Sequence, residues 1–206
     1  MSLHAKPAVT SRPVHDLIKQ RWSPRAFDSR PVEGEKLVQL FEAARWAASS
    51  YNAQPWHYIV ATKDEGETYQ KILDTLVEFN QGWAKGAPVL AISVAARKFA
   101  HNGQPNRHSF HDVGQSTANL VIEATNQGLA VHQMAGFDPE KARSVFGIPE
   151  DYEAVAAMAI GYPGDPEALA GHLREQEHSP RQRKALESFV FGDAWGKASP
   201  LVTSKS

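Results

Sequence analysis

Apolar residues recur every three or four positions in several stretches of the chain. This spacing is typical of amphipathic helices that turn one face toward a core. The helices predicted in this way span residues 35–48, 68–79, 113–128 and 166–177. A further helix is expected to begin after Asp138, which suits an N-cap position and precedes Pro139, and to end at Gly147.

Shorter apolar segments predict strands. These segments lie at 57–62, 88–96, 129–134 and 154–160. The segment 88–96 is apolar at successive positions, so we expect both of its faces to be buried and the strand to lie inside a sheet. Helices and strands alternate along the chain, and by itself this order favours a parallel α/β sheet.

The chain has 206 residues and no linker rich in Pro, Ser or Gly, which indicates one domain. Residues 1–12 are polar and aperiodic, so a disordered tail is expected before a single domain at 13–206. Residues 97–107 also lack periodicity and predict a long surface loop, a candidate lid. The apolar triplet at 189–191 has no neighbouring segment that would pair with it as a strand.

Composition and charge exclude several classes of function. The formal net charge is −1, which argues against a nucleic-acid partner. The absence of cysteine removes disulfides, thiolate metal sites and cysteine nucleophiles. No run approaches 18 apolar residues, so we expect no membrane insertion and a cytoplasmic protein. His101, His108 and His111 lack a further ligand pattern, so no metal site is predicted.

Basic residues supply the first candidate site. The sequence contains neither of the Gly-rich phosphate-binding motifs, so a bound phosphate would have to be held by side chains. Arg21, Ser23 and Arg25 could do this, because guanidinium groups bind phosphate through charge-assisted hydrogen bonds. Arg181 and Arg183 form a second basic pair. The alternative for both groups is a solvated polar surface.

Three segments together resemble the FMN-dependent nitroreductase family. They are RWSPRAF at 21–27, AASSYNAQPWH at 47–57 and QMAGFD at 133–138, and the resemblance spans roughly 13–196. It implies an α+β fold with a mixed, mainly antiparallel sheet flanked by helices. It also implies a homodimer in which each C-terminal arm is exchanged with the other subunit. This expectation replaces the parallel sheet that the order of elements favoured.

The resemblance further implies which residues hold FMN. The implied cofactor-binding residues are Arg21, Trp22, Ser23, Arg25, Ser49, Ser50, Asn52, Gln54, Asn80, Ala135, Gly136, Arg181 and Arg183. Residues 49–54 would reach the flavin of the partner subunit. Arg25 would face the pyrimidine edge and stabilise the anionic reduced flavin, and the backbone at Ala135 and Gly136 would approach the flavin N5.

The implied activity is FMN-dependent oxidation of NADH or NADPH, with ping-pong hydride transfer through flavin N5 to a nitroaromatic, a quinone or a similar small-molecule acceptor. No catalytic side chain is required. Other flavin chemistry on the same fold remains open, namely flavin reduction, reductive dehalogenation or dehydrogenation, as does a non-catalytic FMN-binding protein. Two positions depart from the family. Trp83 occupies a lysine position near Asn80, and Ala135 stands where well-known members carry Glu.

Overall fold

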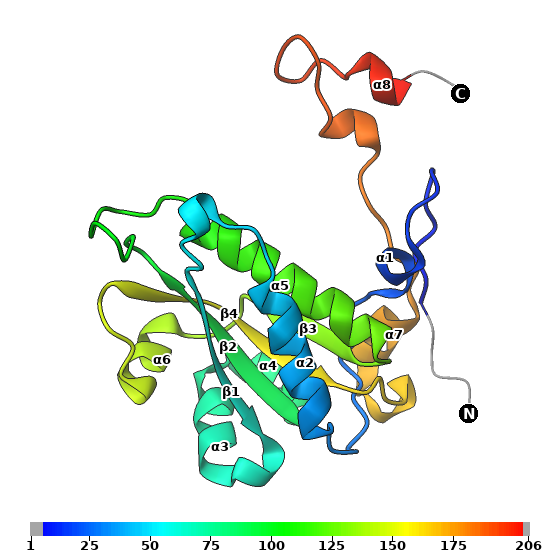
Figure 1. The fold of residues 1–206 in the computed structure, drawn as a ribbon. Coiled ribbons are helices and arrows are strands. Elements are labelled where there is room, and N and C mark those ends of the chain that lie inside the picture. Colours follow the sequence, from blue (N-terminus) through cyan, green and yellow to red (C-terminus); the bar gives the residue numbers. More distant parts are fainter. Residues whose placement is uncertain (1–5, 204–206) are drawn as a thin grey trace.

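A four-stranded antiparallel sheet forms the centre of the computed structural model, which describes residues 6–203 (Figure 1). Its strands are β1 (Trp56–Thr62), β2 (Val89–Ala96), β3 (Ala130–Met134) and β4 (Tyr152–Gly161), in the order β1-β2-β4-β3. All three neighbouring pairs are antiparallel. The predicted strand positions are confirmed and so is the α+β class, whereas the parallel sheet favoured by the order of elements is wrong.

The described part of the chain contains eight helices. They are α1 (Asp16–Gln20), α2 (Gly34–Arg45), α3 (Gly66–Thr75), α4 (Glu78–Ala84), α5 (Ser109–Asn126), α6 (Pro139–Phe146), α7 (Gly171–His178) and α8 (Pro200–Thr203). Short 3₁₀ turns lie at Ser50–Asn52, Lys63–Glu65, Pro166–Ala168 and Leu186–Ser188. None of these helices combines the length and the apolar character needed to cross a membrane.

The prediction of one continuous helix at 68–79 is wrong, because the structure has two helices there, α3 and α4. Leu76 and Val77 between them are extended, with ψ of 150° at both residues. Leu76 forms a bridge with Phe137, and the Val77 N–H donates to Gly136 O at 3.1 Å. These long-range backbone contacts satisfy groups that a continuous helix would have used, so tertiary pairing overrides the helical period.

Helices cover both faces of the sheet. On β2, Val89 and Ala91 pack with Leu40 of α2 and Leu120 of α5, whereas Leu90 and Ile92 pack with α3, α4 and α6 on the other face. Each such buried side chain contributes roughly 1.5–3 kcal/mol relative to an exposed one. The prediction that this strand is central and buried on both faces is therefore confirmed.

Segments predicted to lack regular structure make specific contacts. Residues 6–12 form neither helix nor strand, but the Ala8 N–H donates to Lys19 O at 2.8 Å. The rest of the predicted tail, residues 1–5, lies outside the described residues. The predicted loop at 97–107 contains a small hairpin, since Lys98 pairs with Pro105 and the Phe99 N–H donates to Gln104 O at 2.8 Å.

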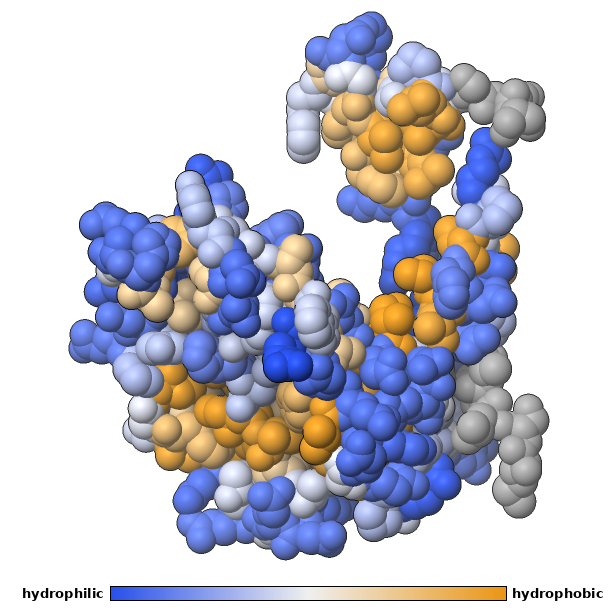
Figure 2. Space-filling view, in the orientation of Figure 1, coloured by the Kyte–Doolittle hydropathy of each residue, from blue (hydrophilic) through white to orange (hydrophobic). Residues whose placement is uncertain are grey.

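The C-terminal arm, residues 185–203, projects away from the sheet (Figure 1). Phe191 forms an isolated bridge with Ala198 inside the arm, but no strand of the described residues pairs with the 189–191 triplet, as the sequence led us to expect. Phe189, Trp195 and Leu201 are 57%, 94% and 88% exposed. Figure 2 shows apolar side chains gathered on this projecting arm. The arm therefore offers apolar surface that its own subunit leaves uncovered.

Candidate functional site

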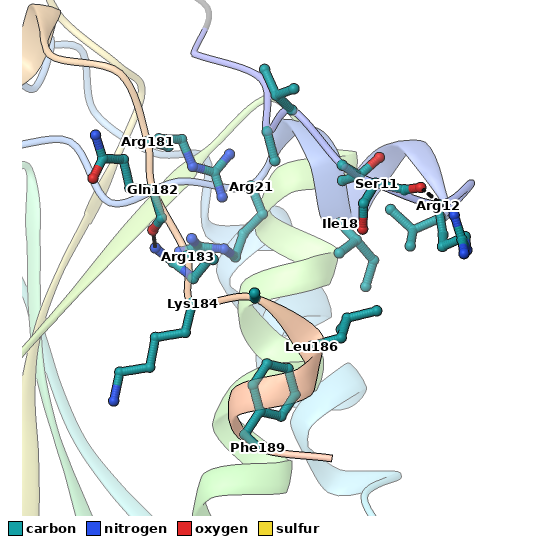
Figure 3. A pocket seen from close by; sticks show the side chains of 15 residues that line it. Ser11, Arg12, Ile18, Arg21, Arg181, Gln182, Arg183, Lys184, Leu186 and Phe189 are labelled. Carbon is teal, nitrogen blue, oxygen red and sulfur yellow. Dashed lines mark hydrogen bonds between the residues drawn. The ribbon is translucent and has the colours of Figure 1, made fainter. Parts of the chain in front are cut away.

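Three arginines from opposite ends of the sequence converge beside α1 (Figure 3). Arg21 directly follows α1, whereas Arg181 and Arg183 follow α7. They line an open hollow of about 600 Å³, and none of the described residues around it is acidic. The sequence prediction of two basic groups that could act together is consistent with this geometry.

The positive charges in this hollow repel one another. Burial lowers the pKa of Arg21, and repulsion from Arg181 and Arg183 lowers it further. The Arg21 Nη1 donates to Ser23 Oγ at 3.0 Å, which aligns the guanidinium with a second polar side chain. A cluster of like charges with hydroxyl support suits a multiply charged anion, since each charge-assisted hydrogen bond contributes roughly 1.5–3 kcal/mol.

Backbone contacts hold the two basic segments in place. Arg181 Nη1 donates to Lys6 O at 3.1 Å and to Lys19 O at 2.8 Å. Arg183 is exposed, and its Nη1 donates to the neighbouring Gln182 O at 2.7 Å. Arg181 therefore links the C-terminal segment to the N-terminal one. Most N–H donors of the exposed Arg183 are accessible to solvent or to a ligand.

The segment that carries Arg21 is fixed to the end of the sheet at Gly164. The Gly164 N–H donates to Ala26 O at 2.9 Å, and Phe27 pairs with Pro163. A Cβ at position 164 would lie 2.5 Å from the backbone carbon of Phe27. Only glycine permits this approach, which sets the path of the chain through Arg21 and Arg25.

Arg25 lies four residues after Arg21 and is half-buried. Its backbone N–H donates to Oε1 of the buried Glu177 at 3.0 Å. Its guanidinium carbon lies 5.9 Å from the centre of the Trp83 ring. The Arg25 Nε is buried and has no hydrogen-bond partner among residues 6–203. Because buried N–H groups are almost always paired, this donor indicates room for an acceptor that the chain itself does not supply.

Asn80 and Gly136 meet although they are 56 residues apart in sequence. Asn80 Nδ2 donates to Gly136 O at 2.9 Å, and Trp83 Nε1 donates to Asn80 Oδ1 at 3.2 Å. A Cβ at Gly136 would come within 2.5 Å of Asn80 Nδ2, so this contact requires glycine. The Gly136 N–H donates no hydrogen bond within the described residues. Ala135 beside it is exposed.

Trp22 is next to Arg21 in sequence but does not line the hollow of the clustered arginines. With Thr125 and Leu129 it lines a second hollow of about 430 Å³. The Lys6 ammonium lies 5.3 Å from the centre of its ring. Trp22 is therefore near the basic hollow but also faces the C-terminal end of α5.

The segment 49–54, which follows α2, lies apart from α1 and the residues beside it (Figure 1). The Ser50 N–H donates to Asp112 Oδ2 at 3.0 Å, at the start of α5. Arg21 and Trp22 share a hollow with Thr125 near the other end of this helix. The two helix positions are about 20 Å apart at 1.5 Å per residue. One subunit therefore does not bring residues 49–54 to its own arginine cluster.

The turn at 49–54 has an unusual backbone. Tyr51, Asn52 and Gln54 have positive φ of 53°, 51° and 47°. Such conformations cost free energy in residues other than glycine, and they concentrate at functional sites. The Gln54 N–H donates to Ser49 Oγ at 3.0 Å, which closes the turn and leaves its amide side chains on the surface.

The structure adds His132, which the sequence interpretation missed. This residue of β3 packs against Trp83 with the ring centres 4.6 Å apart, and its Nδ1 lies 2.9 Å from Pro24 O. Burial, together with the smaller effect of the nearby Arg25 and Arg21 charges, lowers the pKa of His132 to about 4. The imidazole is thus neutral at pH 7, with the Nδ1–H donating to Pro24. The sequence did offer one signal for this residue: His132 is a lone histidine in an apolar strand, directly before the 133–138 segment.

The neutral His132 predicts a dependence of stability on pH. Its folded-state pKa of about 4 lies below the usual 6.5, so the unfolded chain binds the proton first as the pH falls. The free energy of unfolding should therefore decrease between pH 6.5 and 4, by up to about 3 kcal/mol at 1.4 kcal/mol per pKa unit. Urea unfolding of His132→Gln, compared with the wild type across this range, should show a shallower decrease. Parallel pH curves would contradict the prediction.

Among residues 6–203 no group of three or more His, Cys, Asp or Glu side chains is arranged as metal ligands. His111 Nδ1 instead lies 3.0 Å from Asp112 Oδ1. His101 packs against Phe99, with the ring centres 5.4 Å apart.

The antiparallel α+β fold thus carries a cationic hollow near a half-buried arginine, and this arrangement suits an anionic ligand. The model of the nitroreductase family matches residues 18–81 and 67–162, which together make up more than half of the chain. The chain belongs to the nitroreductase family, and it is an oxidoreductase.

Individual relatives agree with this assignment. A Thermus thermophilus protein named NADH dehydrogenase is 30% identical, over 84% of this chain and 92% of its own length. An uncharacterised 15.4 kDa Mycolicibacterium smegmatis protein is 39% identical over 90 residues, which are 44% of this chain and 60% of that protein. A crystal structure described as an oxidoreductase containing FMN has a TM-score of 0.86 and 33% identity, covering 91% of this chain and 96% of that one.

Proposed function

We propose that the protein binds FMN and uses NADH or NADPH to reduce a small-molecule acceptor such as a nitroaromatic or a quinone. The cluster of Arg21, Arg181 and Arg183 carries this proposal, because it offers a phosphate three guanidinium groups with no competing carboxylate around the hollow in the described residues. The nitroreductase family and the FMN-containing neighbour support the choice of flavin. When bound, FMN would accept hydride from the nicotinamide at N5 and pass it to the acceptor.

The other predicted residues take roles around this phosphate site. Ser23 would add a hydroxyl to the phosphate side, and Trp22 would pack beside it. Arg25 would place its charge and its unpaired Nε–H at the flavin ring, where negative charge develops on reduction. The backbone of Ala135 and Gly136 would supply N–H donors to the same ring, and Asn80 would face the pyrimidine side.

The proposal includes a homodimer with shared sites, built from one domain at 13–206. The distance between residues 49–54 and the arginine cluster of the same subunit supports contribution of Ser49, Ser50, Asn52 and Gln54 to the partner's site. The exposed apolar arm supports an exchange in which it covers the second subunit. Obligate interfaces of this kind bury roughly 2,000–5,000 Å².

The cofactor is tested by its release from the purified protein. We expect a yellow protein that releases FMN and not FAD on denaturation, because the arginine cluster accommodates one terminal phosphate. Anaerobic NADH or NADPH should bleach the flavin before any acceptor is added. Double-reciprocal plots at several nitroaromatic concentrations should give parallel lines.

Three results would contradict parts of this proposal. A colourless protein that takes up no added FMN would exclude the cofactor. A flavin that neither NADH nor NADPH reduces would favour a non-catalytic flavoprotein or an oxidative reaction. Intersecting kinetic lines would exclude the ping-pong order, since they require both substrates to be bound together.

A further inference from the structure

Trp83 connects the groups that we assign to the flavin ring. It is 4% exposed, and its indole N–H donates to Asn80 Oδ1 at 3.2 Å. Its ring packs against Phe27 with an interplanar angle of 14° and the ring centres 6.4 Å apart. His132 contacts it as well, and the Arg25 guanidinium carbon lies 5.9 Å from the ring centre. One buried side chain therefore touches both an amide and a cation of the proposed site.

The hydrogen bonds on both sides of Asn80 leave its amide only one orientation. Trp83 Nε1 is only a donor, and Gly136 O is only an acceptor. The oxygen of the amide must therefore face Trp83, and its nitrogen must face Gly136. Within the described residues one of the two Nδ2 hydrogens is used by Gly136, and the second remains available for a ligand. Without the indole donor, the amide oxygen would lose its partner and the orientation would be less constrained.

The cation beside Trp83 is held by the face of the ring. An arginine that lies over an indole ring within about 6 Å of its centre is attracted by the ring quadrupole. His132 on the same ring is neutral at pH 7, so it adds no competing positive charge. The aromatic group of Phe27, Trp83 and His132 can thus support the Arg25 side chain without repelling it.

We propose that Trp83 is a positioning residue, which orients the Asn80 amide and aligns Arg25 so that both stabilise the reduced flavin. This inference rests on the proposed function. Trp83 itself need not touch the cofactor.

The test compares Trp83→Phe with the wild type, both loaded with FMN. Phenylalanine keeps an aromatic ring but removes the N–H donor. We expect reduced FMN to be bound at least tenfold less tightly relative to oxidised FMN, which lowers the two-electron midpoint potential by about 30 mV. Trp46→Phe is the matched control, because the exposed Trp46 also donates its indole N–H, to Glu42 Oε1 at 2.8 Å. Its midpoint potential should equal that of the wild type.

A double-mutant cycle with Asn80→Ala identifies the route of the effect. If Trp83 acts through the amide, Trp83→Phe should change the potential less in the Asn80→Ala background than in the wild type. Equal shifts in both backgrounds would overturn that route, and an unchanged potential in Trp83→Phe would overturn the inference.

Folding and cofactor loading are controlled separately. Thermal unfolding of the flavin-free proteins shows whether Trp83→Phe folds, and Trp83→Leu, which also lacks a donor, is the substitute if it does not. Should neither fold, Asn80→Ala alone decides, because an unchanged potential in that variant would overturn the inference. Failure of the wild type to bind FMN would instead refute the proposed function, so the two failures are distinguishable.

Discussion

Removal of residues 186–206 should convert the protein into a monomer that no longer retains FMN. The shortened chain keeps Arg21, Arg181 and Arg183, so its own phosphate hollow loses only part of its wall. We nevertheless expect loss of flavin, because residues 49–54 could no longer be held against the site of a partner. Light scattering after size-exclusion chromatography and flavin absorbance of the same peak measure both effects.

The physical basis is the apolar surface of the arm. Trp195 is 94% exposed and Leu201 is 88% exposed in the single subunit. Burial of such side chains against a second subunit contributes about 25 cal/mol for each Å² removed from water. The internal pairing of the arm, including the Ser199 N–H to Val190 O hydrogen bond at 3.0 Å, means that it can be presented as one unit.

Lys197→Ala is the matched control, because Lys197 pairs with Asp193 at the surface of the arm and exposed ion pairs contribute little. This variant should remain dimeric and yellow. A truncated protein that is monomeric yet keeps FMN and full activity would refute the exchanged arm. A truncated protein that remains dimeric would show that the interface lies elsewhere.

The strands could be predicted from the sequence because each depends on a local apolar run. Val89 to Ala96 is apolar at nearly every position, and this predicted both its extent and its burial. Its partner in the sheet could not be predicted in the same way. β2 pairs with β4 about 60 residues later, for example Ile92 with Ala157, and strand order depends on packing between distant segments. The alternation of elements therefore gave the wrong sheet direction.

The candidate site shows a similar division. The residue types at Arg21, Ser23, Arg181 and Arg183 suggested phosphate binding, but only the structure brings residues 160 positions apart around one hollow. The break at Leu76 depends on contacts with residues 136–137, which no local period encodes. Asn80 and Trp83 are neighbours on α4, but the orientation of the Asn80 amide also depends on the distant Gly136. The backbone of Tyr51 is likewise set by closure of the 49–54 turn.

Replacement of Arg21 by Gln should affect cofactor binding and stability differently. We expect FMN to bind roughly 10- to 100-fold more weakly, because at least one charge-assisted hydrogen bond of about 1.5–3 kcal/mol is lost. The flavin-free protein should lose little stability. Removal of this charge relieves repulsion with Arg181 and Arg183, which offsets the lost hydrogen bond to Ser23 Oγ. Fluorescence titration with FMN and urea unfolding of the flavin-free protein measure the two quantities.

Arg45→Gln is the control for loss of an arginine charge as such. Arg45 lies on α2, forms an ion pair with Glu42 and does not line the hollow. It should bind FMN like the wild type. High salt should also weaken FMN binding less in Arg21→Gln than in the wild type, because fewer charges contribute to the attraction. Equal FMN affinity in Arg21→Gln and Arg45→Gln would exclude the arginine cluster as the phosphate site. A large loss of stability in flavin-free Arg21→Gln would contradict the expected relief of repulsion among the three guanidinium groups. It would indicate that Arg21 is needed for folding.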